Sequence, residues 1–245
     1  MKNAIKTVLK SCGTGRKVYP LIQRWYRRYS VPRARKRLHT YGYDVLRTVD
    51  DVATRHNVPY FASYGTLLGF VRDGGFIAHD EDIDFGVLAG QMTPVQLLDI
   101  FLKQETGFEF VRALEFKNRI TEVTIRHKRI IVDFFFYERD GDRTFVASYY
   151  WEPTRDYPSA RENSVRLIYQ ATVTQLTRLT IHGVDVSVPV NSEELLVSQY
   201  GPNWRIPDPN WNNENHPGIV KQDGYGYSAG LERVYELDVE INPTG

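Results

Sequence analysis

Two aspartates near the middle of the chain, Asp82 and Asp84, lie two residues apart in a stretch that alternates acidic and apolar side chains. Ile83 and Phe85 fill the alternate positions, as in a β-strand with one buried face. The two carboxylates then project from the same face, roughly 6–7 Å apart at the backbone, and they repel each other unless a cation lies between them. A lone Asp-x-Asp is more often part of a solvated turn. Within an apolar strand, however, the spacing predicts a metal site, because Mg²⁺ is usually held by one or two carboxylates and substrate phosphates.

A third acid, Asp133, lies in a second apolar segment, residues 130–137. An unpaired charge among these aromatic side chains would be costly to bury. We therefore expect Asp133 to join the two aspartates in one catalytic site. The alternative is a buried acid paired with Arg126 or Lys128.

The segment before the acids reads as a strand, a turn, a short helix and a glycine stop. Residues 60–63 form an aromatic strand, Gly65 and Thr66 turn the chain, and Thr66 caps a helix over residues 67–72 that ends at Gly75. Backbone amides at this turn and the N-terminus of the helix are suited to bind phosphate. The pattern predicts a phosphate site at Gly65 and Thr66.

Arg72 closes this helix. A guanidinium group binds phosphate through two parallel hydrogen bonds, so we predict that Arg72 contacts the substrate. An ion pair with Asp73 or Asp80 is the alternative. Asp80 and Glu81 are expected to lie outside the metal's ligands.

These residues together resemble a known family. Gly-Thr-Leu-Leu-Gly at residues 65–69, followed by Arg72, Gly75, Ile77 and Asp-Glu-Asp-Ile-Asp at residues 80–84, is similar to the LicD/fukutin family of nucleotidyltransferase-fold phosphotransferases. A second segment, residues 193–208, resembles the C-terminal region of that family, so the resemblance spans about residues 45–210. The family often has Pro-Trp before the acidic cluster, where this chain has Ala78 and His79.

The resemblance implies a transferase that depends on Mg²⁺, or on Mn²⁺ in its place. It would move a phospho-substituent, such as phosphocholine or a phospho-polyol, from a CDP-activated donor to a hydroxyl of a cell-surface glycan or its lipid-linked precursor. Asp133 would then be the base for that hydroxyl or a ligand of a second ion. The expected site residues are Asp82, Asp84 and Asp133 for catalysis, Asp82 and Asp84 for the metal, and Gly65, Thr66, Arg72 and Gly75 for the substrate.

Two other functions fit parts of the pattern. A sugar-nucleotide glycosyltransferase also uses Asp-x-Asp to hold a diphosphate, but it more often has a nucleotide-binding βαβ region before that motif. A non-catalytic scaffold would keep the fold alone, and the intact acids disfavour it.

The 245 residues predict one α+β domain: a nucleotidyltransferase-like mixed sheet with flanking helices, over residues 38–245. Residues 150–165 read as irregular, and residues 201–230 as an ordered loop or lid with Trp204, Trp211, Tyr225 and Tyr227. These four aromatic residues either stack on a ligand or pack within the loop. Further elements are expected as strands near residues 108–114, 122–126, 130–137 and 144–148, a hairpin over 176–188, and helices over 94–102 and 192–200.

Residues 1–37 form a basic amphipathic arm, with a new helix starting at Pro32. Residues 1–40 carry twelve Lys and Arg and no acid, which leaves 19 basic against 30 acidic residues, a net charge of −11, for the rest. The arm predicts attachment to an anionic membrane surface, with packing on its own domain or on a second subunit as alternatives. The acidic remainder disfavours a nucleic-acid partner. One cysteine and no apolar leader predict a cytoplasmic protein, peripheral on the inner face of the membrane if the arm binds there. The oligomeric state stays open.

Overall fold

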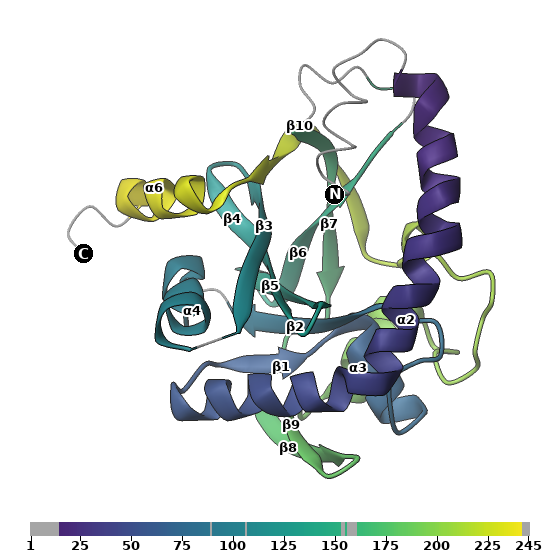
Figure 1. Cartoon of the computed structure of the whole chain (residues 1–245), viewed down its shortest axis with the longest axis vertical. Coiled ribbons are helices and arrows are strands. Elements are labelled where there is room, and N and C mark those ends of the chain that lie inside the picture. Colours follow the sequence, from purple (N-terminus) through teal and green to yellow (C-terminus); the bar gives the residue numbers. More distant parts are fainter. Residues whose placement is uncertain (1–14, 89, 106, 153–154, 156–160, 242–245) are drawn as a thin grey trace.

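The computed structural model describes residues 15–88, 90–105, 107–152, 155 and 161–241, and it shows an α+β fold (Figure 1). The helices are α2 (Gly15–Arg55), α3 (Tyr64–Arg72), α4 (Pro94–Asp99) continued by a π-helical turn (Ile100–Gln104), α5 (Ser192–Tyr200), a 3₁₀ turn (Asn213–Asn215) and α6 (Leu231–Ile241). The strands are β1 (Tyr60–Ala62), β2 (Asp82–Leu88), β3 (Phe108–Phe116), β4 (Arg119–His127), β5 (Ile130–Asp140), β6 (Arg143–Tyr150), β7 (Glu162–Gln170), β8 (Leu176–Ile181), β9 (Val184–Pro189) and β10 (Ile219–Ala229).

Eight strands form one strongly curled sheet in the order β1-β2-β5-β4-β3-β10-β7-β6. Only β2 and β5 run parallel, and the other pairs in the described residues are antiparallel. The last strand, β6, returns to pair with the end of β5, so the strands from β5 to β6 close into a ring. This closure gives the sheet a concave side, and β8 and β9 form a separate hairpin.

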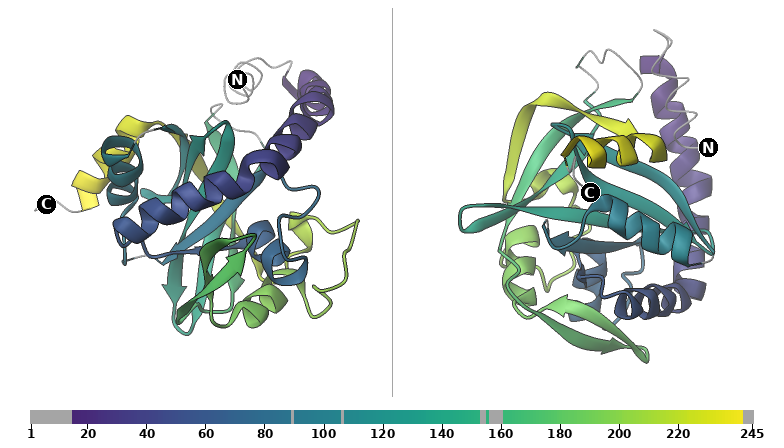
Figure 2. Two further views of the ribbon diagram at one scale, coloured as in Figure 1. Left: turned by 60° about the horizontal axis from the view of Figure 1, so that its bottom comes forward. Right: turned by 90° about the vertical axis from the view of Figure 1, so that its left-hand side faces the viewer.

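The two faces of β2 and β5 differ in the way that the alternating pattern predicts. Ile83, Phe85, Val132 and Phe134 are fully buried in the main hydrophobic core. Helix α2 packs on β2 and β5, and α6 packs on β3, β4 and α4, as the views in Figures 1 and 2 show. The acidic residues of the same strands face the concave side. The hydrophobic core packs against the opposite face and holds the strands in position.

Helix α2 is one continuous helix from Gly15 to Arg55. The prediction of a new helix start at Pro32 is therefore wrong. Pro32 is exposed, and the same helix buries Val31, Leu38 and Val45, so packing outweighs the single hydrogen bond that a proline removes. The helix crosses the predicted boundary between residues 37 and 38, and the division into arm and domain stays a prediction. The first amphipathic segment of the arm lies outside the described residues.

Two strands were missed. Residues 162–170 form β7 rather than irregular chain, and residues 219–229 form β10 rather than part of a loop. Strand β10 has a bulge between Gln222 and Tyr225, and its glycines suggested a loop. Gly226 instead permits close packing, since a Cβ there would lie 2.1 Å from the Tyr149 ring. Backbone pairing to β3 and β7 thus overrides the local signal.

Candidate active site

A row of polar residues crosses four strands on the concave side of the sheet. Asp84 of β2 is in register with Asp133 of β5, Asp133 with Thr124 of β4, and Thr124 with Arg112 of β3. Neighbouring strands are about 4.8 Å apart, so each side chain lies within reach of the next. The structure therefore brings two of the three predicted catalytic acids together.

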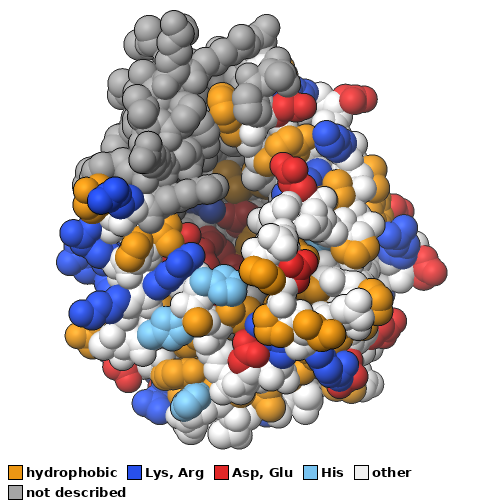
Figure 3. All heavy atoms as spheres, turned by 90° about the vertical axis from the view of Figure 1, so that its right-hand side faces the viewer, with side chains coloured by type: hydrophobic (Ala, Val, Ile, Leu, Met, Phe, Trp, Pro, Cys, Tyr) orange, Lys and Arg blue, Asp and Glu red, His pale blue; other side chains and the backbone are white. Residues whose placement is uncertain are grey.

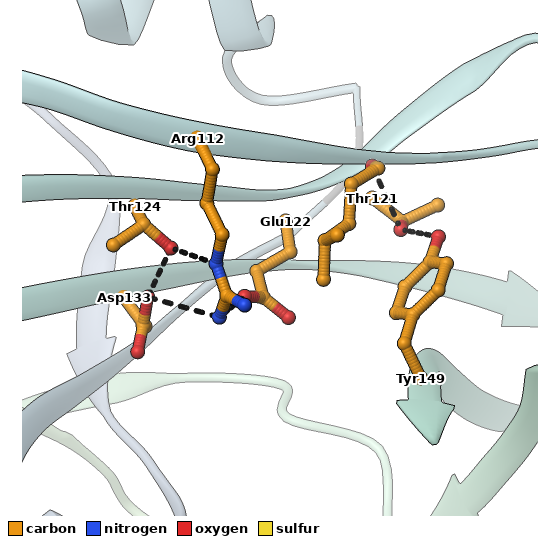
Figure 4. A network of polar contacts seen from close by, with 7 residues as sticks. Arg112, Thr121, Glu122, Thr124, Asp133 and Tyr149 are labelled. Atoms are coloured by element: carbon orange, nitrogen blue, oxygen red, sulfur yellow. Dashed lines mark hydrogen bonds and ion pairs between the residues drawn. The ribbon is translucent and has the colours of Figure 1, made fainter. Parts of the chain in front are cut away.

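A hydrogen-bonded network holds this row in place (Figure 4). The Thr124 hydroxyl donates to Asp133 and accepts a 3.1 Å hydrogen bond from Nε of Arg112. Nη2 of Arg112 donates to Oε1 of Glu122 at 2.7 Å and lies 4.0 Å from Oδ1 of Asp133. One guanidinium group thus serves two buried carboxylates.

The alternative partners considered for Asp133 are engaged elsewhere. Arg126 pairs with Glu109 across the β3–β4 ladder, and Nζ of Lys128 lies 3.8 Å from Asp44. Asp133 is instead in the network of Arg112 and Thr124, on the same side of the sheet as Asp84. This placement is consistent with a catalytic role.

Desolvation and the neighbouring charges shift the pKa values of the acids on this side. Burial, and next the charges of Asp82 and Asp133, raise the pKa of Asp84 well above its ordinary value. Burial also raises the pKa of Glu122 to about 7, with Asp133 adding to the rise and Arg112 opposing it. A nearby positive charge would reverse these shifts.

The residues after β1 support the acids from one end. Ser63, rather than Thr66, is the residue before helix α3, so the predicted cap at Thr66 is wrong. The buried Thr66 hydroxyl accepts a 2.9 Å hydrogen bond from the backbone N–H of Asp84 and so fixes β2 to α3. A Cβ at Gly65 would lie 3.2 Å from both carboxylate oxygens of Asp80, so glycine allows that carboxylate to approach the helix. Burial raises the pKa of Asp80 to about 6.

Two predicted substrate residues make other contacts. Arg72 pairs in a fork with Asp73, at 2.8 Å for both hydrogen bonds, as in the alternative weighed for it. Gly75 allows close packing of Tyr43, whose hydroxyl would lie 2.6 Å from a Cβ at this position. Gly65 lines the cavity described next, whereas Thr66, Arg72 and Gly75 do not. Their substrate contacts stay predictions.

The concave side encloses a cavity of about 670 Å³ with the acids at its base. Its walls come from the polar row, from α3 and α5, from β6, β7 and β10, and from the loop after α5. In the space-filling view, acidic side chains lie in the hollow (Figure 3). The lining includes Asp80, Glu81, Asp82, Asp84, Asp133, Arg112, Glu122, Tyr64, Tyr200, Trp211, Asn163 and His216. This volume is within the range of small-ligand sites.

The loop aromatics divide between ligand-facing and packing positions. Trp211 lines the cavity and contacts the ring of Tyr200, with centroids 4.8 Å apart. Trp204 is buried in the core, under the guanidinium group of Arg205. Tyr225 packs against Arg155, and Tyr227 is largely exposed. Of the four, only Trp211 is placed to touch a ligand.

The structure adds cavity residues that the sequence reading missed, chiefly Arg112, Glu122 and His216. Glu122 and Thr124 alternate on β4 in the same way as the aspartates of β2, which was an available signal. His216 follows a polar loop and gave none. Burial, with the Arg166 charge, lowers the pKa of His216 to about 4, so it is a neutral group of the wall at pH 7.

The donor atoms fit a magnesium ion that is shared with a phosphate-bearing ligand. Asp82 and Asp84 offer carboxylate oxygens, which hard divalent ions prefer, and desolvation together with the neighbouring acids raises the pKa of Asp84. Among the described residues, no group of three or more His, Cys, Asp or Glu side chains is arranged as a ready-made metal site. Ligand phosphates would therefore complete the coordination.

Comparison with known proteins places this site in a family. The model of the LicD/FKTN/FKRP nucleotidyltransferase domain matches residues 57–191, which include the acids of β2 and β5. Ribitol-5-phosphate transferase FKTN of Mus musculus is 24% identical over 182 residues, covering 74% of this chain and 36% of that protein. An uncharacterized protein of Caenorhabditis elegans is 25% identical over 158 residues, covering 63% and 40%. The human FKTN transferase is 23% identical over 197 residues, covering 79% and 40%. The chain thus spans well under half the length of these relatives.

Proposed function

Because the chain belongs to the LicD/FKTN/FKRP nucleotidyltransferase-domain family, we propose that it is a phosphotransferase of glycan modification. It would take a phospho-substituent, such as phosphocholine or a phospho-polyol, from a CDP-linked alcohol and place it on a hydroxyl of a glycan or its lipid-linked precursor. The FKTN relatives are ribitol-5-phosphate transferases, and their reaction is of this chemical type.

One observation carries the proposal: the half-buried Asp84 of β2 lies beside the buried Glu122 and Asp133 of β4 and β5, and the network of these two buried acids contains one guanidinium group, that of Arg112. Such a cluster of acids persists in a folded protein when a ligand supplies positive charge. A divalent ion bound by Asp82 and Asp84 with a diphosphate does so. When bound, it withdraws charge from the phosphoryl group and from the departing oxygen.

The residues of the chain have separate roles in this reaction. The acceptor oxygen bonds to the phosphorus that carries the alcohol, the bond from that phosphorus to the oxygen shared with CMP breaks, and CMP leaves. Asp133 lies beside Asp84 and takes the proton of the acceptor hydroxyl. Arg112 positions Asp133 through Thr124, and the neutral wall of Tyr200 and Trp211 excludes water.

The nucleotide product tests this assignment. The purified chain is incubated with CDP-choline or CDP-ribitol, Mg²⁺ and a polyol or glycan acceptor, and the nucleotides are separated by chromatography. Release of CMP, with the phosphate on the acceptor, is the expected result. In a parallel incubation with UDP-linked and CDP-linked sugars, release of UDP or CDP would instead identify a glycosyltransferase, and binding without turnover of any donor would favour a scaffold.

A further inference from the structure

The outer side of α2 carries positive charge that the chain does not pair. We define the cationic patch as Arg33, Lys36 and Arg37 of α2 with Arg129 of the β4–β5 turn. None of the ion pairs between described residues includes a member of the patch, and the first acid of the sequence is Asp44. Elsewhere in the described chain the ion-paired arginines include Arg55, Arg72, Arg112, Arg119, Arg126, Arg178, Arg205 and Arg233.

The members of the patch lie close enough to repel one another. The pKa of Arg37 is lowered by burial and next by the charges of Arg129 and Arg33. Arg33, Lys36 and Arg37 also line a hollow of about 280 Å³ together with Thr40 and Tyr41. An anion in this hollow would relieve the repulsion and meet several hydrogen-bond donors at once.

Exposed tyrosines flank the patch along the helix. Tyr41 is 49% exposed and Tyr29 is 42% exposed, one on each side of Arg33 and Arg37 in the sequence. Tyrosine has an apolar ring and a polar tip, and it is enriched where a surface is apolar on one side and wet on the other. Basic side chains between such rings are typical of a helix that lies in a lipid headgroup layer.

The same helix borders the mouth of the cavity. Arg35 and His39 of α2 are near enough to Asp80, a cavity residue, for their charges to oppose the rise of its pKa. Nε2 of His39 lies 3.3 Å from the carbonyl oxygen of Ala78, in the segment that leads to the acids. Figure 3 shows Lys and Arg side chains beside the hollow that holds the acidic ones.

We propose that the cationic patch docks the protein on an anionic lipid bilayer, with the headgroup phosphates in the hollow on α2 and the cavity mouth beside the membrane. Residues 41–245 carry a net charge of −11, so an anionic surface repels the body of the protein as a whole and attracts its α2 side. Docking does not depend on the reaction proposed above. Its consequence, that the acceptor is lipid-linked, rests on that reaction.

The test is co-sedimentation of the full chain with vesicles made of equal parts phosphatidylcholine and phosphatidylglycerol, and with pure phosphatidylcholine. The patch variant is Arg33→Gln/Lys36→Gln/Arg37→Gln. The matched control is Lys117→Gln/Arg139→Gln/Lys221→Gln, which removes three exposed cations that no ion pair uses. Since each basic residue near an anionic surface contributes about 1 kcal/mol, the patch variant should bind roughly a hundredfold more weakly at low salt. Rising salt should weaken binding of the wild type.

Three results would overturn the proposal. The patch variant could bind anionic vesicles as tightly as the wild type, the control could lose as much affinity as the patch variant, or neutral vesicles could bind equally well. Tighter binding to a DNA duplex than to the anionic vesicles would assign the patch to nucleic acid instead. CMP release with a soluble acceptor should be unchanged in the patch variant, so that loss of docking and loss of the proposed activity are separate readouts.

Discussion

The acidic cavity and the cationic patch each gather charges of one sign, negative in the cavity and positive in the patch. The protein places these two groups of charges in opposite environments. Glu122 is buried and Asp84 half-buried on the concave side of the sheet, where desolvation raises the pKa of both. Arg33 and Lys36 stand on the exposed side of a helix. Interactions between charges are stronger in a poorly hydrated interior than in water. The like charges of the cavity therefore repel one another more strongly than those of the patch.

The largest expected effect is on catalysis in the cavity. Asp82→Asn and Asp84→Asn should each lower kcat by a factor on the order of a thousand or more, because each removes charge that holds the metal against the transferring phosphate. Asp142→Asn, in the exposed turn after β5, is the matched control and should retain full activity. Near-normal turnover of either cavity variant in saturating Mg²⁺ would contradict the metal assignment.

The next effect is on stability and concerns Arg112, the cation of the acidic network. Arg112→Gln leaves Glu122 and Asp133 without their guanidinium partner and should lower the free energy of unfolding by roughly 2–3 kcal/mol, less than for a fully buried pair because Arg112 is 34% exposed. Urea unfolding at pH 8 measures it. Adding Glu122→Gln should restore part of the loss, and a double variant no more stable than Arg112→Gln would show that the excess charge is not the cause.

The third effect is a pH dependence. Glu122 has a pKa of about 7 in the folded protein, raised from its ordinary value of 4.5. Its protonated form therefore favours the folded state at low pH, and this contribution is lost as the pH rises from about 4.5 through 7. We expect the Tm, measured without metal, to fall over this range in the wild type. The fall should be smaller in Glu122→Gln, and an equal fall in both proteins would assign the titration to another group.

The smallest effect is expected at the patch. Replacing Arg33, Lys36 and Arg37 by glutamine should change the free energy of unfolding by no more than about 0.5 kcal/mol, because exposed charges without partners contribute little. Urea unfolding of the patch variant beside its matched control is the measurement. A loss of more than about 2 kcal/mol would mean that these cations hold the fold together, and the two regions would then not differ as proposed.

The sequence was informative wherever the pattern was local. Alternation of acids and apolar residues predicted β2 and β5 and the shared face of Asp82 and Asp84, and the structure confirms both elements. Packing on the core carries α2 through Pro32, and pairing with distant strands makes β10 from a glycine-rich segment. Neither the core packing of α2 nor the long-range pairing of β10 can be recognised from a short segment of the sequence.

The same limit applies to the site. Arg112 belongs to the acidic network only because β3 and β4 pair in a register that places it opposite Thr124. Thr66 supports Asp84 through a hydrogen bond between segments eighteen residues apart, rather than by capping its own helix. Residue types and spacing can thus nominate the acids, but partners that come from other strands require the fold.

If the acids around Asp84 are short of positive charge, the thermal stability of Asp84→Asn should show it. Differential scanning fluorimetry would compare this variant with the wild type, without ligand and with Mg²⁺ and CDP together. We expect the variant without ligand to melt at the same temperature as the wild type or higher, because a desolvated charge has been removed. We also expect Mg²⁺ and CDP to stabilise the wild type and not the variant. A variant that melts lower without ligand and is stabilised by Mg²⁺ and CDP as much as the wild type would contradict the claim.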